Sequence, residues 1–247
     1  MTRLVQLGGA VVAERPVPEA GAMTDGFGRA IEYLRISVTD KCNLRCVYCM
    51  PEEGLPWLRR EQLLSYEEIG EVVRTMAGLG LRRVRITGGE PLVRRDLPSL
   101  VRILRGIPGI DDISLSTNAV LLAEHADALR AAGLDRVNVS LDSLIPGRID
   151  AISRRPGSAR TIMEGLEAAE RAGFFPIKVN CVVMRGRNDD EVEAFAAITR
   201  ERPWHVRFIE VMPTGDNLGV SQDEYVSSAE ILDRIARIGD LRPVAGP

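Results

Sequence analysis

The feature of this sequence that most constrains its fold is a regular alternation of short apolar runs with amphipathic segments of helical length. Runs such as YLRISV and RVRIT, rich in β-branched residues, are typical of strands. Strands that alternate with helices require crossover connections, so the pattern predicts an α/β fold with a parallel sheet covered by helices. Six such units form either a doubly wound open sheet or an incomplete barrel. The expected strands are residues 33–38, 83–87, 112–116, 136–141, 175–184 and 204–211.

Capping signals mark the helices between these strands. Ser65, with Glu68 three residues later, forms a capping box that opens a helix running to Gly80. Asp96 is expected to cap the next helix, which ends near Gly106. The remaining expected helices cover residues 121–132, 158–172 and 189–200.

The two ends of the chain lack this alternation. Residues 1–28 are rich in Gly, Pro and Ala without sustained periodicity, which predicts a flexible N-terminal extension. Residues 29–220 hold the six βα units and form the expected core domain. Residues 221–247 are expected to begin a further C-terminal region.

Composition limits the classes of function. The net charge of −3 and the pI of about 5.6 give no overall basic field that would attract nucleic acid or anionic lipid. No apolar run approaches the roughly 20 residues that span a bilayer, and no secretory signal is evident. Three cysteines lie within eight residues and the fourth is distant, which is unlike a disulfide framework and indicates a reducing cytoplasm.

Chemically distinctive segments follow five of the six expected strands. The segment TDKCNLRCVYCMPEEG follows the first strand, and TGGEP, STN, SLDS and MPTG end the second, third, fourth and sixth. Since the carboxyl ends of parallel strands share one edge, the sequence predicts a single site at that edge.

The cysteine spacing in the first of these segments allows three interpretations. A zinc site would need a fourth ligand from elsewhere. A redox pair of Cys46 and Cys49 would leave Cys42 without a role. A 4Fe–4S cluster bound by all three thiolates would leave its fourth iron open to a ligand that is not protein. The side chains that could complete a zinc site are Cys181, which we expect to be a buried thiol, His125 and His205.

The stretch CNLRCVYC resembles the cluster-binding loop of the radical S-adenosylmethionine (SAM) superfamily. The resemblance implies a 4Fe–4S cluster held by Cys42, Cys46 and Cys49, with SAM on the open iron and a 5′-deoxyadenosyl radical as the reactive species. TGGEP resembles the GGE motif of the superfamily, whose paired glycines would let the backbone approach a ligand closely. The cofactor-binding residues implied by the resemblance are Tyr48, Gly89, Glu90, Ser140 and Met212.

Six segments between residues 33 and 215 together resemble the GTP 3′,8-cyclase family of molybdenum cofactor (molybdopterin) biosynthesis. They include LRISVTDKCNLRCVYCMP, RVRITGGEPLVRRDL, RVNVSLDSL and IKVNCVVMRGRNDDE. The resemblance implies an incomplete (βα)6 barrel of the TIM type and a lyase that converts GTP to (8S)-3′,8-cyclo-7,8-dihydroguanosine 5′-triphosphate. In this reaction the radical abstracts the ribose C3′ hydrogen. The implied partners are GTP, an electron donor such as a flavodoxin or ferredoxin, the next pathway enzyme and, as an open alternative, a second copy of the chain.

Four cations on the expected strands match positions that hold GTP in this family. Arg35 and Arg85 precede the cysteine loop and TGGEP, and we expect both to project at the edge that carries the site. Lys178 is distinctive because the chain has only one other lysine, Lys41. The resemblance implies catalytic roles for Arg35, Arg85 and Lys178, and substrate contacts from these three together with Ser116 and Arg207.

The sequence also departs from the family pattern. The family carries three further cysteines in a C-terminal region for a second 4Fe–4S cluster, and the sequence to Pro247 contains none of these. This puts GTP cyclisation by these residues alone in question and predicts exposed apolar surface at the open side of the barrel. Ala119 stands where the family has glycine, so a left-handed backbone would be costly there. The alternatives are a radical SAM enzyme with another substrate and a non-catalytic iron–sulfur scaffold.

Overall fold

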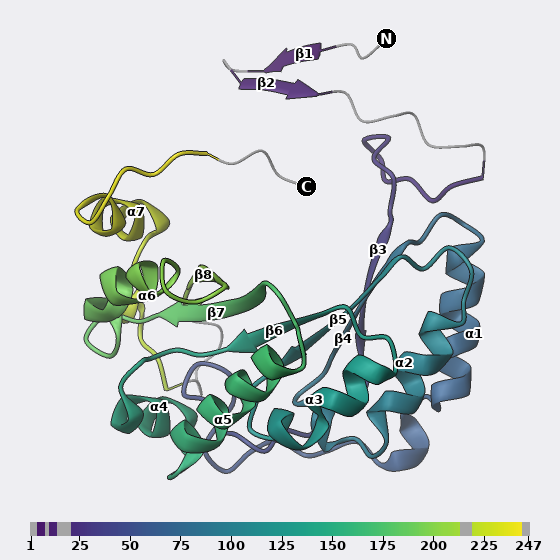
Figure 1. Cartoon of the computed structure of the whole chain (residues 1–247), viewed down its shortest axis with the longest axis horizontal. Helices are drawn as coiled ribbons and strands as arrows, with labels where there is room; N and C mark the ends of the chain where they lie inside the picture. Colours follow the sequence, from purple (N-terminus) through teal and green to yellow (C-terminus); the bar gives the residue numbers. More distant parts are fainter. Residues whose placement is uncertain (1–3, 8–9, 14–20, 213–218, 244–247) are drawn as a thin grey trace.

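A computed structural model describes residues 4–7, 10–13, 21–212 and 219–243. Its main sheet has six parallel strands in the order β3-β4-β5-β6-β7-β8, so each strand pairs with the next one in the chain. A doubly wound sheet reverses its strand order, and this sheet does not. The sheet curves with the helices on its outer side, which confirms the incomplete barrel (Figure 1). The strands are β3 (Tyr33–Ser37), β4 (Arg83–Thr87), β5 (Asp112–Thr117), β6 (Arg136–Ser140), β7 (Ile177–Val183) and β8 (Trp204–Glu210).

The predicted helices all occur, and two α-helices were not predicted. The predicted ones are α1 (Tyr66–Ala77), α2 (Leu97–Arg105), α3 (Leu122–Ala131), α5 (Ser158–Arg171) and α6 (Val192–Ile198). The additional ones are α4 (Pro146–Ser153) and α7 (Ser228–Ala236). Short 3-10 turns are η1 (Arg60–Gln62), η2 (Pro91–Val93), η3 (Asp189–Glu191) and η4 (Gln222–Glu224).

The two predicted caps have different outcomes. The Ser65 hydroxyl accepts from the Glu68 amide at 3.1 Å, and the Glu68 carboxylate accepts from the Ser65 amide at 2.7 Å, so this capping box is confirmed. The expectation for Asp96 is wrong, because its side chain makes no capping bond and its backbone is left-handed with φ 55°. The Asp96 carboxylate instead accepts from the Ser99 hydroxyl at 2.6 Å.

The core lies between the outer face of the sheet and the helices. Outward-facing residues alternate along each strand with residues that face the hollow of the barrel, as the burial pattern of β7 shows most regularly. Each fully buried aliphatic side chain stabilises the fold by about 1.5–3 kcal/mol. The fully buried strand residues include Val84, Ile86, Ile113, Leu115, Val137, Val139 and Val179.

Two local features differ from expectation. Within the stretch expected to be a flexible extension, β1 (Leu4–Leu7) and β2 (Ala10–Ala13) pair as antiparallel strands. Ala119 adopts the left-handed backbone that its side chain disfavours, with φ 63°, so the turn keeps the conformation typical of glycine. Among the described residues, no helix is long and apolar enough to cross a membrane.

Candidate active site

The cysteine loop begins where β3 ends and is held by the C-terminal end of α4. The amides of Arg45 and Val47 donate to the carbonyls of Ser153 and Ile152 at 3.0 and 2.9 Å. The side chains of Arg154 and Arg155 donate to the carbonyls of Met50 and Asn43, at 3.1 and 2.9 Å. A segment that the sequence analysis left unassigned therefore supports both sides of the predicted cluster loop.

The three thiols of this loop lie within eight residues of the sequence and influence one another's pKa. Burial raises the pKa of Cys42, and the charge that Cys49 would carry raises it further. Burial likewise raises the pKa of Cys46, and the charges of Asp142, Cys49 and Cys42 raise it further. These pKa values describe thiols without a metal, since a bound cation would favour the thiolate.

Two observations fit a cluster at this position. The Leu44 amide points at the sulfur of Cys42 at 3.4 Å, so a backbone donor is already directed at one prospective ligand. The side-chain nitrogen of Asn43 is buried, and within the described ranges it has no hydrogen-bond partner. An unmet donor on the residue that follows Cys42 suits the anionic sulfurs of an iron–sulfur cluster.

The zinc interpretation gains nothing from the structure. Within residues 21–212 and 219–243, no three His, Cys, Asp or Glu side chains, those of Cys42, Cys46 and Cys49 included, are arranged to hold one metal ion. Cys181 is 1% exposed and burial raises its pKa, which confirms the predicted buried thiol.

The two glycines of TGGEP also serve close backbone packing, a role beyond the one expected from the sequence. A Cβ atom on Gly88 would lie 2.5 Å from the carbonyl oxygen of Thr39, and one on Gly89 would lie 2.4 Å from that of Lys41. The Gly89 amide donates to the Thr39 carbonyl at 2.7 Å, and the Glu90 amide to the Lys41 carbonyl at 2.8 Å. The glycines therefore let this segment pair closely with the start of the cysteine loop.

Glu90 joins the ends of two strands. Its carboxylate is 1% exposed and accepts from the Thr117 hydroxyl and the Asn118 amide, both at 2.7 Å, and from the Leu92 amide at 3.0 Å. Burial raises the pKa of Glu90 to about 7, although these hydrogen bonds lower it. The side chain of Asn118 in turn donates to Asn43 at 2.7 Å, so Glu90 is connected to the cysteine loop.

A small cavity of about 30 Å³ brings together residues from three of the predicted segments. Its lining includes the predicted site residues Cys46, Tyr48 and Ser140. It also includes Asn118 and Asp142, to which the sequence analysis gave no role. Both lie within two residues of a strand end, in STN and SLDS, and this position is the signal that could have identified them.

The predicted cations face the hollow of the barrel from four strands. Arg35 of β3 lies opposite Arg85 of β4, and Arg85 lies opposite Ser114 of β5. A second row runs from Ser116 through Asn138 to Lys178. Arg207 of β8 lies opposite Asn180. All five predicted substrate residues therefore come from one face of the sheet.

This face has little negative charge to balance it. Partial burial lowers the pKa of Lys178, and Arg136, Arg207 and Arg85 lower it further. The pKa of Arg85 is also lowered, again by burial first and by neighbouring cations. Arg136 has a carboxylate partner, Asp112, at 2.9 Å, whereas no ion pair involves the other four cations in the described part of the chain. Such a surface suits a polyanion.

Two placements differ from the sequence-based expectation. Arg35 and Arg85 are the third residues of five-residue strands, so they lie inside the barrel and not at its edge. Met212 is 73% exposed, and the rest of MPTG lies outside the described residues.

Ile209 on the inner face of β8 and Tyr33 on β3 are 40% and 39% exposed, so apolar surface is present near both edges of the sheet.

The sequence model of the Radical SAM superfamily matches residues 36–198. A GTP 3′,8-cyclase of Pelotomaculum thermopropionicum is 52% identical over 226 residues, which cover 91% of this chain and 69% of that protein. The chain belongs to the GTP 3′,8-cyclase family of the radical SAM superfamily. A GTP 3′,8-cyclase of Moorella thermoacetica is 49% identical over 221 residues, covering 90% and 68% of the two chains. The chain thus spans about two thirds of these family members.

Solved structures of other radical SAM proteins share the fold. Methylornithine synthase (PylB) has a TM-score of 0.64 at 18% identity, over 83% of this chain and 61% of that one. Streptococcus suis SuiB, determined with bound S-adenosylmethionine, has a TM-score of 0.64 at 16% identity, over 84% and 46% of the two chains. These similarities confirm the barrel architecture.

Proposed function

We propose that this chain forms the radical-generating barrel of a GTP 3′,8-cyclase in molybdenum cofactor biosynthesis. The observation that carries the proposal is the combination of a three-cysteine loop at the carboxyl end of β3 with unpaired cations on the adjoining inner face. Membership of the family supports the same conclusion.

Cys42, Cys46 and Cys49 would hold a 4Fe–4S cluster, and Tyr48, Gly89, Glu90, Ser140 and Met212 would surround SAM. When bound, these two groups would supply the radical that removes the ribose C3′ hydrogen of GTP. The hydrogen bonds of Glu90, Asn118 and Asp142 hold the protein scaffold at this end in a fixed arrangement, which would limit reorganisation on binding.

We expect the substrate to bind at the inner face of the sheet. Lys178, Arg85, Arg35 and Arg207 would bind the triphosphate, because phosphate oxygens can replace the anions that these side chains lack. Ser116, on the row that leads to Lys178, would contact GTP through its hydroxyl. The cations would also place the ribose beside the cofactor, which is their proposed part in catalysis.

Three finer assignments belong to the same proposal. A flavodoxin or ferredoxin would supply electrons, and the next enzyme of the pathway would accept the product. The protein would act in the cytoplasm, where its thiols stay reduced.

The proposal is tested by anaerobic reconstitution with iron and sulfide. Electron paramagnetic resonance (EPR) of the reduced protein should show a cluster signal that shifts when SAM is added, and 5′-deoxyadenosine should form when GTP is present. Uptake of one zinc ion without a cluster would overturn the proposal. A cluster that cleaves SAM while GTP fails to bind would instead favour a radical SAM enzyme with another substrate.

A further inference from the structure

Asp142 connects the end of β6 to the cysteine loop. One carboxylate oxygen accepts from the Tyr48 hydroxyl at 2.8 Å, and the other accepts from the Val182 amide at 2.9 Å. Tyr48 lies between Cys46 and Cys49 in the sequence, and Cys46, Tyr48 and Asp142 line the same small cavity. A side chain from a distant strand end therefore contacts the residue between two prospective cluster ligands.

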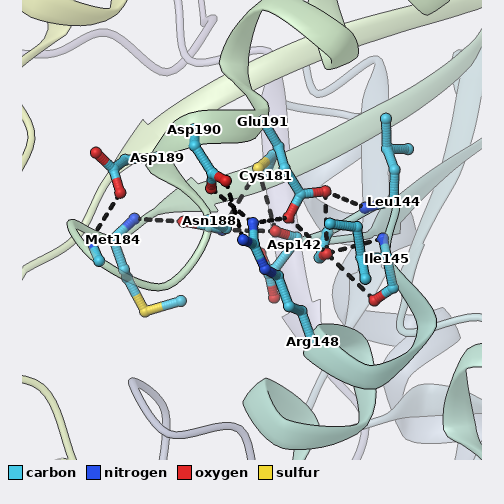
Figure 2. A network of polar contacts seen from close by, with 12 residues as sticks. Asp142, Leu144, Ile145, Arg148, Cys181, Met184, Asn188, Asp189, Asp190 and Glu191 are labelled. Carbon is cyan, nitrogen blue, oxygen red and sulfur yellow. Dashed lines mark hydrogen bonds and ion pairs between the residues drawn. The ribbon is translucent and has the colours of Figure 1, made fainter.

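The segment that follows β7 hydrogen-bonds to the backbone of Asp142. Figure 2 shows Asn188 directed at Asp142, with its side-chain nitrogen donating to the Asp142 carbonyl at 2.5 Å and to the Val182 carbonyl at 2.8 Å. The Asn188 oxygen accepts from the Met184 amide at 2.7 Å. Asn188 is 1% exposed and uses both ends of its amide, so it fixes the ends of β6 and β7 relative to each other.

Glu191 holds the residues that follow Asp142. Its carboxylate accepts from the Ser143 hydroxyl at 2.8 Å, the Leu144 amide at 2.7 Å and the Arg148 guanidinium at 2.9 Å (Figure 2). Asn188 and Glu191 both belong to the RGRNDDE segment, for which neither cofactor nor substrate binding gives a use. Their contacts indicate that this segment stabilises the loop that carries Asp142.

We propose that Asp142 and Tyr48 are positioning residues that hold the cysteine loop in the conformation that binds the cluster. The hydrogen bond between them has a carboxylate acceptor, and such bonds are stronger than neutral ones. It fixes the phenol ring, and with it the backbone between the second and third cysteines. Groups that orient metal ligands in this way commonly change metal retention about ten- to hundred-fold when removed.

The proposal rests on the cluster assignment above, and its test measures the cluster directly without using GTP turnover. Tyr48→Phe removes one oxygen and leaves the backbone bond from Val47 to Ile152 in place, so the loop should still fold. Tyr66→Phe is the matched control, because the Tyr66 hydroxyl donates to the Arg95 carbonyl at 2.9 Å and neither residue belongs to the cysteine loop. Asp142→Ala and the double variant Tyr48→Phe/Asp142→Ala complete a cycle.

Each reconstituted protein is mixed with an iron chelator under anaerobic conditions, well below its melting temperature, and iron release is followed together with EPR of the reduced cluster. Tyr48→Phe should release iron about ten-fold faster than the parent or more, with an altered EPR line shape. Tyr66→Phe should match the parent. The double variant should release iron no faster than Asp142→Ala alone, because the hydroxyl has no partner once the carboxylate is gone.

Parental iron release and EPR in Tyr48→Phe would overturn the proposal, as would effects that multiply in the double variant. A loss of thermal stability in Tyr48→Phe without faster iron release would show a purely structural bond and would also overturn it. If Asp142→Ala does not fold, Tyr48→Phe and its control still decide the question. A parent protein that binds no cluster would overturn the proposed function itself, before any variant is compared.

Discussion

The cysteine end of the barrel and its inner face are organised in opposite ways. Around the cysteines, Glu90, Asp142 and Asn118 are engaged in hydrogen bonds that join strand ends to one another and to the cysteine loop. On the inner face, Lys178 and Arg85 have other cations as neighbours and no carboxylate partner among the described residues. A resident cofactor requires fixed ligands, whereas a substrate that enters and leaves can supply the missing charge itself. The cysteine end therefore suits a cofactor that stays bound, and the inner face suits a substrate that binds and leaves.

The largest expected effect is the loss of a thiolate from the ordered end. Cys42→Ala should lower cluster content and 5′-deoxyadenosine formation by more than about a hundred-fold, since one iron loses its protein ligand. Cys181→Ala is the control, because this buried thiol is not an expected cluster ligand and makes polar contacts only with the Asp142 carbonyl and the Asn188 side chain among the described residues, at 3.8 and 4.0 Å. Iron analysis and product assay distinguish the two, and equal losses in both variants would contradict the division between the ends.

Gly89→Ala tests whether the ordered end depends on close backbone packing. The added methyl group would meet the Lys41 and Asp40 carbonyl oxygens at 2.4 and 2.5 Å, so we expect a loss of about 1–3 kcal/mol in the free energy of unfolding. Gly147→Ala is the control, since nothing lies within 4 Å of its added methyl group. Urea unfolding of the apo-protein measures both. An unchanged Gly89→Ala would mean that this segment is looser than the contacts indicate.

Lys178→Ala tests the unpaired charge on the inner face. We expect GTP affinity to fall about ten-fold, because a charge-assisted hydrogen bond to phosphate is lost. The affinity should also depend less on salt than that of the parent. Arg160→Ala removes an equal charge from the exposed side of α5 and should leave GTP affinity unchanged. Calorimetric titration at two salt concentrations provides the measurement, and similar effects of both substitutions would indicate only a general charge effect.

The smallest expected effect concerns the stability of the same face without substrate. The folded state lowers the pKa of Lys178, so its charge opposes folding at pH values below that pKa, and the penalty disappears as pH rises through the unfolded value of about 10.4. Lys178→Met should therefore raise the free energy of unfolding at pH 7 by roughly 0.5 kcal/mol, a value reduced for solvent screening. Urea unfolding between about pH 7 and pH 10.4 should show that this gain in the free energy of unfolding decreases as the pH rises. A gain that stays constant would point to packing and not to charge.

Much of the architecture follows from local patterns in the sequence. The alternation of strands and helices predicts the parallel sheet, and the Ser65 and Glu68 pair predicts the start of α1. The same Ser-x-x-Glu pattern at Ser227 and Glu230 marks α7, which the sequence analysis passed over. Pro146 at the first turn of α4 is a further signal of this kind.

By itself, the sequence determined the order of the six main strands, the three neighbouring cysteines, the burial of Cys181 and the strands that carry the cations, because each depends on local periodicity or spacing. Only the tertiary structure decided why Gly88 and Gly89 are needed and which carboxylate reaches Tyr48. Tyr48 and Asp142 are 94 residues apart in the chain. Contacts across such a separation depend on strand register and loop packing, which a local pattern does not encode.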